Sequence, residues 1–131
     1  MEKLQIRTRQ QQEFVDMTDQ VTQLVRQSGL DSGFCHLFCP HTTAAITFNE
    51  NWDPDVRRDL GIAFDALVPQ RPDFSHAEGN SPAHVKASLL GSDHTLFIEG
   101  GRLVLGRWQG VYLAEFDGPR TRTVYVKMRG D

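Results

Sequence analysis

The sequence has no long apolar run and no excess of positive charge. None of its apolar stretches approaches the roughly 18 residues that a membrane-spanning helix needs, so we expect no membrane insertion. The first ten residues, MEKLQIRTRQ, contain no apolar core of the kind that a secretion signal requires. Basic residues number 14 and acidic residues 17, a net charge of −3. Nucleic-acid-binding proteins are usually basic, so we expect no nucleic-acid partner.

Cysteine is also scarce, with only Cys35 and Cys39 in the chain. The segment between them has the composition of a strand, in which four residues span about 13 Å. A disulfide requires Cα atoms within about 7 Å of each other. We therefore expect two free thiols that act as small core residues, and a reducing, cytoplasmic location.

The apolar residues that are present suffice for one domain over residues 1–131. Leu, Ile, Val and Phe together make up 34 of the 131 residues. This share exceeds the roughly 20% below which disorder is expected. A chain of this length also buries roughly two-thirds of its unfolded surface, so it can build its own core.

Helical and strand patterns alternate along the chain. The apolar spacing predicts three helices, over residues 16–27, from Asp53-Pro54 to just before Pro69, and over residues 81–90. Period-two alternation predicts about seven strands, over residues 4–8, 34–38, 42–48, 95–98, 103–105, 111–116 and 121–128. The predicted fold class is α+β, a largely antiparallel β-sandwich of about seven strands with about three helices.

A polar strand face follows His41. In a regular strand, His41, Thr43, Thr47 and Asn49 share one side, and mostly apolar residues share the other. Such a face can carry a binding site, but a solvated sheet surface gives the same pattern.

The segment from His76 to His84 concentrates polar chemistry at a predicted helix start. His76 and Glu78 point the same way in extended backbone, Gly79 allows a sharp turn, and Asn80 or Ser81 caps the helix. His84 then falls in the first helical turn. The unpaired N–H groups of that turn can bind phosphate or carboxylate.

Three histidines and one carboxylate are a donor set that suits a catalytic metal. We expect His41, His76 and His84 to bind a divalent ion, zinc or magnesium, with Glu78, Asn80 and His84 as catalytic residues. The spacing is not a standard zinc signature. The alternative is that Asn80 and Ser81 only cap the helix and that the histidines are surface residues.

Two further features are expected to be solvated. His94 lies in a polar stretch, and the basic residues of the last strand, Arg120, Arg122, Lys127 and Arg129, are typical of an exposed face.

Five motifs in order resemble the YjbQ family, also called UPF0047. They are His41-Thr42-Thr43-Ala44, Asn49-Glu50-Asn51 with Asp53-Pro54-Asp55-Val56, His76-x-Glu78-Gly79-Asn80-x-x-Ala83-His84, Leu105-Gly106-x-Trp108-Gln109, and Glu115-Phe116-Asp117-Gly118-Pro119-Arg120. The family pattern usually has Thr where this chain has Arg107. A hydroxyl contact at that position is therefore missing here if the family uses one.

The resemblance implies a YjbQ-like α+β sandwich that assembles as a homotrimer, with a pocket at the matching histidines near a subunit boundary. It also implies a thiamine-phosphate synthase-type transferase. That reaction joins a pyrimidine methyl diphosphate to a thiazole phosphate and releases pyrophosphate. The expected ligand is a small phosphorylated or anionic molecule. The alternative is a non-catalytic protein that binds a small anion or a metal in the same pocket, since fold and family do not settle function.

Overall fold

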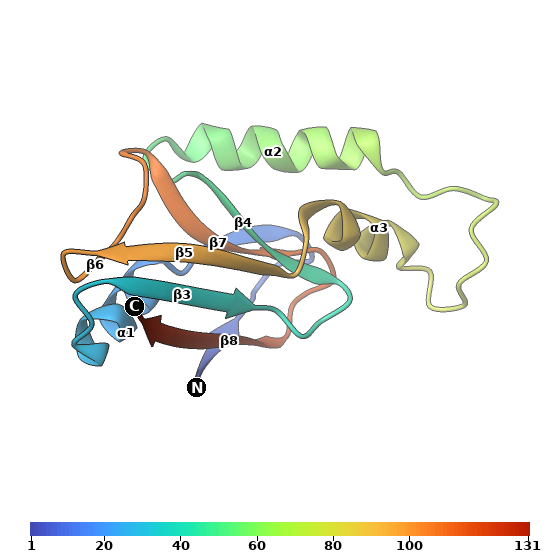
Figure 1. The fold of residues 1–131 in the computed structure, drawn as a ribbon. Coiled ribbons are helices and arrows are strands. Elements are labelled where there is room, and N and C mark those ends of the chain that lie inside the picture. The colour runs from blue at the N-terminus through green and yellow to red at the C-terminus, as the bar shows by residue number, and fades with distance from the viewer.

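A computed structural model describes all residues 1–131 and contains three helices and eight strands (Figure 1). The helices are α1 (Thr18–Ser28), α2 (Pro54–Leu67) and α3 (Ser81–Leu90). The strands are β1 (Glu2–Arg7), β2 (Glu13–Asp16), β3 (Gly33–Phe38), β4 (Ala44–Glu50), β5 (Asp93–Glu99), β6 (Arg102–Leu103), β7 (Gln109–Glu115) and β8 (Thr121–Gly130).

The strands form two antiparallel sheets, which confirms the predicted α+β class. A five-stranded sheet has the order β1-β8-β3-β5-β6, and a three-stranded sheet has the order β2-β7-β4. Strand β2 was not predicted. It has only four residues, and its last one, Asp16, was interpreted as the cap of the first helix. This strand exists because it pairs with β7, and such pairing with a distant segment is not visible in the local alternation of residues.

The main core lies between the two sheets, with α1 closing one side. It contains Cys35 and Leu37 of β3, Ile46 of β4, Leu113 of β7 and Val21 of α1, all of them buried. Both cysteines are buried and unpaired, as expected. Burial raises the pKa of the Cys35 thiol to about 11.

A second apolar cluster joins the three-stranded sheet to α2 and α3, which cover its outer face (Figure 1). Ala45 of β4 packs there with Ala83 and Ala87 of α3. The three-stranded sheet is therefore covered on both faces, and the polar face predicted after His41 is wrong. Thr43 is buried, and Asn49 at the far end of the strand is exposed.

The helix ends largely follow the predicted signals. Asp53 accepts a hydrogen bond from the Asp55 N–H at the start of α2, and Gly29 ends α1 with a φ of 70°. The expected side-chain cap of α3 is wrong, because Asn80 makes no side-chain hydrogen bond to its helix. None of the three helices is long and apolar enough to cross a membrane.

Candidate functional site: two hollows on helix α3

His76 and His84 lie in contact at the start of α3. Their ring centroids are 5.3 Å apart and the rings are nearly perpendicular. The Gly79 N–H donates to the His76 carbonyl at 3.1 Å, and the left-handed φ of 73° at Gly79 closes that turn. The turn carries the exposed ring of His76 back over the half-buried ring of His84.

His84 also lines a hollow that it shares with His41. This hollow of about 470 Å³, called the histidine hollow below, is bordered by His41, Thr42, Ala44, His84, Ala87, Ser88, Gly91 and Ser92. Its polar side chains are two imidazoles and three hydroxyls, and no carboxylate borders it. Such a lining suits a negatively charged group.

His41 is held in a defined tautomer at one side of the histidine hollow. Its Nε2 accepts a hydrogen bond of 2.9 Å from the Thr123 backbone N–H, so a neutral ring carries its proton on Nδ1. Burial, followed by the positive charge of Arg122, holds the pKa of His41 below its usual value. Both effects favour the neutral form of the ring.

A buried ion pair lies next to His41 in the structure, between Arg122 and Glu115. Arg122 is 2% exposed and Glu115 is 0% exposed. The Arg122 Nε donates to Glu115 Oε1 at 2.9 Å, and Nη2 donates to Thr43 Oγ1 at 2.8 Å. Burial alone would raise the pKa of Glu115, but hydrogen bonds from Arg122 and Thr8 outweigh it and hold this pKa below its usual value.

The prediction that Arg122 belongs to a solvated basic strand is therefore wrong. Side chains of β8 alternate between the two sides of the strand from Thr121 on, and Arg122 points inward, where Glu115 compensates its charge. No local pattern identifies that partner, because the pair joins two strands across a turn and binds a third segment at Thr43.

Glu78 and Asn80 line a different hollow from the two histidines. This second hollow, of about 450 Å³, is called the lysine hollow below. It is bordered by Gln11, Gln12, Asp65, Gln70, Glu78, Gly79, Asn80, Pro82, Ala83, Lys86, Phe116 and Asp117. The predicted set is thus divided: His41 and His84 share one hollow, His76 touches His84, and Glu78 with Asn80 lies in the other.

The first turn of α3 offers few free backbone donors. The N–H groups of Ala83 and His84 both bond to the Asn80 carbonyl, and Pro82 has no N–H. The anion site expected from the helix start alone is therefore largely occupied by the chain itself. An anion here would depend on side chains.

The donor set does not form a preassembled metal centre within one chain. No group of three or more His, Cys, Asp or Glu side chains is placed to hold a metal ion. His76 and His84 are the only two of the predicted ligands whose rings are in contact.

The environments of two other side chains were not evident from the sequence. The prediction that His94 is solvated is wrong, because its Nε2 lies 2.7 Å from the Ile46 carbonyl and its ring meets Phe48 edge-on. The guanidinium of Arg107 lies 4.8 Å from the ring centroid of the half-exposed Trp108. Where the resemblance implies a threonine, this chain thus has a cation over an aromatic ring.

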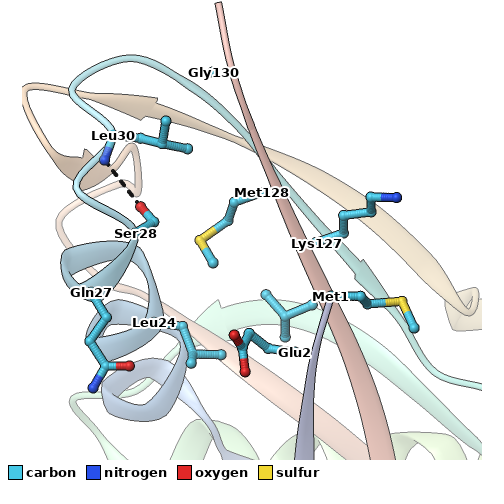
Figure 2. Close-up of a pocket in the computed structure, with 10 residues that line it drawn as sticks. Met1, Glu2, Leu24, Gln27, Ser28, Leu30, Lys127, Met128 and Gly130 are labelled. Atoms are coloured by element: carbon cyan, nitrogen blue, oxygen red, sulfur yellow. Dashed lines mark hydrogen bonds between the residues drawn. The ribbon is translucent and has the colours of Figure 1, made fainter.

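A third hollow, of about 370 Å³, lies between α1 and the ends of β1 and β8 (Figure 2). Half of its lining residues are apolar, among them Leu24, Leu30 and Met128, and the others include Glu2 and Lys127. None of the predicted site residues borders it.

Comparison with known proteins gives a consistent result. The family model described as "UPF0047 protein YjbQ-like" matches residues 2–131. The UPF0047 protein YugU of Bacillus subtilis is 47% identical over 99% of both chains. A crystal structure of an uncharacterized YjbQ/UPF0047 family protein from Clostridium acetobutylicum superposes with a TM-score of 0.95 at 49% identity, covering 98% of this chain and 100% of the other. A YjbQ-like protein of unknown function from Sulfolobus solfataricus has a TM-score of 0.94 at 34% identity, with 99% of this chain and 96% of the other covered.

Proposed function

Since the chain belongs to the YjbQ-like UPF0047 family, we propose that it is an enzyme that acts on a phosphorylated small molecule. The histidine hollow holds the phosphate. The observation that carries this proposal is the lining of that hollow, where His41 and His84 stand beside three hydroxyls without any carboxylate. The Ser88 hydroxyl already donates to the His84 carbonyl at 2.9 Å. The hydroxyls of Thr42 and Ser92 and the imidazole N–H groups can donate to phosphate oxygens, and no fixed negative charge on the wall repels them.

The reaction we propose is the transfer that the family resemblance implies. The C–O bond between a pyrimidine methyl group and its diphosphate breaks, a bond from that carbon to a thiazole nitrogen forms, and pyrophosphate leaves. In this scheme His84 donates to the leaving phosphate, and His76, in contact with it at 5.3 Å between centroids, supports its orientation. Glu78 and Asn80 stay candidate catalytic residues of this proposal, but both line the lysine hollow and neither borders the histidine hollow.

A divalent metal remains part of the prediction, with zinc or magnesium as candidates. The single chain supplies no three-ligand group, so no step of the proposed reaction depends on a metal. An ion held by His76 and His84 would take its remaining ligands from the bound phosphate or from a neighbouring copy.

The second candidate function is binding of a small anion without turnover. It is favoured by the division of the predicted set, because Glu78 borders the lysine hollow and not the histidine hollow. Within one chain, the only carboxylate of the predicted catalytic set is thus not placed beside both histidines.

We also propose a homotrimer located in the cytoplasm. Two exposed tryptophans, Trp52 and Trp108, meet edge-on with centroids 6.0 Å apart, and Trp52 is 78% exposed. Large exposed aromatic side chains favour an interface between copies.

The cytoplasmic location is proposed because the two free thiols favour a reducing compartment. The trimer is tested by its mass. Light scattering at micromolar concentration should give three times the mass of the chain, and a stable monomer would contradict this proposal.

The test of the enzymatic proposal uses His84→Ala with His36→Ala as its control. His36 is exposed on β3 and borders neither hollow. Its ring lies against Phe34 and within hydrogen-bond distance of the Thr95 hydroxyl. Pyrophosphate release is measured with the two phosphorylated substrates, and pyrophosphate binding is measured by calorimetry. His84→Ala should lower turnover by about 10²-fold or more, as expected for a positioned proton donor, while its free energy of unfolding changes by about 1 kcal/mol or less.

Three outcomes distinguish the candidate functions. Turnover that His84→Ala removes and His36→Ala retains supports the enzyme. Pyrophosphate binding without turnover in the unmodified protein supports the non-catalytic alternative. Equal pyrophosphate binding by the unmodified protein and His84→Ala contradicts both, because the histidine hollow would then not be the site.

A further inference from the structure

The lysine hollow contains a cation that is almost completely buried. Lys86 is 6% exposed, and its Nζ donates to Gln12 Oε1 and to Asp65 Oδ1, both at 2.7 Å. An ammonium group has three N–H donors, so these two bonds leave one without a hydrogen-bond acceptor, and the ring centroid of Phe116 lies 5.7 Å from Nζ. Burying an ammonium is costly unless its donors are satisfied, so the remaining donor favours an acceptor inside the hollow.

A buried acceptor borders the same hollow. The Asn80 Nδ2 donates to Asp117 Oδ2 at 2.8 Å. A carboxylate only accepts hydrogen bonds, so this contact fixes the orientation of the amide. The Asn80 Oδ1 is thereby left buried without a hydrogen-bond partner, and it is the only such side-chain atom in the chain. A buried acceptor of this kind requires a donor to compensate the lost hydration.

The charges around the hollow disfavour an anionic ligand. Lys86 is paired with Asp65, and Arg120 is paired with Asp117 at 3.2 Å. Glu78 has no ion-pair partner, so the lining carries one uncompensated negative charge. The unpaired carboxylate disfavours an anion, and the remaining N–H donor of the Lys86 ammonium disfavours a second cation. The lining therefore favours a neutral ligand that accepts from Lys86 and donates to Asn80.

We propose that the lysine hollow is a binding site for a neutral polyhydroxylated molecule of about monosaccharide size. A hydroxyl group both donates and accepts, so neighbouring hydroxyls satisfy the Lys86 ammonium, the Asn80 Oδ1 and the Glu78 carboxylate together. The amide side chains of Gln11, Gln12 and Gln70 extend the same chemistry along the wall. The volume of about 450 Å³ lies within the range of roughly 300–1,000 Å³ that small-molecule sites occupy. This site does not depend on the function proposed for the histidine hollow.

The test is an NMR titration of the full chain with D-ribose, D-glucose and myo-inositol as separate probes. At least one probe should shift the side-chain amide signals of Asn80 and Gln12 saturably, with a dissociation constant in the range of about 1–10 mM for a small neutral ligand held by hydrogen bonds. Lys86→Met and Asn80→Ala should each weaken this binding by about tenfold or more. His84→Ala should leave it unchanged, because His84 borders only the histidine hollow.

Two results would overturn the proposal. One is the absence of saturable shifts with all three probes in the unmodified protein. The other is unchanged affinity in Asn80→Ala, whose side chain supplies the unpartnered acceptor. If Lys86→Met fails to fold, Asn80→Ala decides alone. Pyrophosphate added as a fourth probe should affect the His84 signals and not those of Asn80, which keeps this test separate from that of the histidine hollow.

Discussion

The histidine hollow and the lysine hollow use two faces of one short helix, yet their chemistry is opposite. His84, Ala87 and Ser88 of α3 border the first, and Pro82, Ala83 and Lys86 border the second. The first has imidazoles and hydroxyls without a carboxylate, whereas the second has three carboxylates and several amides around one lysine. The 3.6-residue period of a helix thus lets a ten-residue segment present two faces of different polar chemistry, one to each proposed site.

The two hollows also differ in the burial of the ion pair beside them. Next to the histidine hollow, Arg122 and Glu115 are both almost inaccessible to solvent. In the lysine hollow, Lys86 is paired with Asp65, whose side chain is 64% exposed. A buried pair that loses one partner leaves an uncompensated charge, whereas an exposed carboxylate is solvated by water. The ion pair beside the histidine hollow should therefore be the more sensitive to substitution.

The largest expected effect comes from Arg122→Met. Removing the guanidinium leaves the Glu115 carboxylate buried without its cation, so the free energy of unfolding should fall by about 3–5 kcal/mol. Lys86→Met is the matched substitution in the other hollow, and it should cost about 1 kcal/mol because Asp65 can turn to solvent. Urea unfolding of both variants checks the comparison. Equal losses of stability would show that the two ion pairs do not differ as described.

A smaller effect is expected from Gly79→Ala, which alters the turn connecting the two hollows. Gly79 has a φ of 73°, and a Cβ there would meet no atom within 4 Å. The cost is therefore backbone strain, of about 1–2 kcal/mol, and not a steric clash. The strained turn should also displace His76 from His84 and Glu78 from the lysine hollow, so both pyrophosphate and polyol binding should weaken. Gly29→Ala, which has a φ of 70° at the end of α1, is the control. It should cost similar stability and leave both binding reactions intact.

The smallest expected effect is a pH dependence specific to the histidine hollow. The folded-state pKa of His41 lies below its usual value of 6.5, so the unfolded chain binds this proton more readily than the folded one. The contribution of neutral His41 to stability is thus complete above about pH 6.5 and is lost as the pH falls toward the lower folded-state pKa.

His41→Gln should remove that slope, because its amide oxygen can still accept from the Thr123 N–H but does not titrate in this range. Urea unfolding between about pH 7 and about pH 5 measures the slope in both proteins. The lower limit avoids Glu115, whose depressed pKa acts below its usual value of 4.5. An unchanged slope in His41→Gln would contradict the assignment to His41.

Much of the fold was predictable because the signals that define it are local. Asp53-Pro54 begins α2 and Gly91 ends α3, at the positions expected from capping chemistry and glycine freedom. The hairpin between β5 and β6 follows from Gly100 and Gly101, which both have left-handed φ values. The family resemblance is equally local, since its motifs are short runs of adjacent residues.

The candidate site was predictable only in part, because its members come from distant segments. His76 and His84 are eight residues apart in the sequence, and their contact follows from the turn at Gly79 and the helix start at Ser81. The separation of Glu78 from the histidine hollow could not be read from this spacing, since it depends on how α3 packs against β4.

The sequence by itself determined the helices, most strands, the free cysteines and the family, because period, capping and composition act within a few residues. Only the tertiary structure decided which side chains share a hollow and which charges are buried. It turned Arg122 inward to Glu115, placed the His94 ring against Phe48, and left the Asn80 Oδ1 without a partner. These outcomes depend on contacts between residues far apart in the chain. The packing of strands and helices decides which side chains are buried, and burial determines the energetic cost of each charged or polar group.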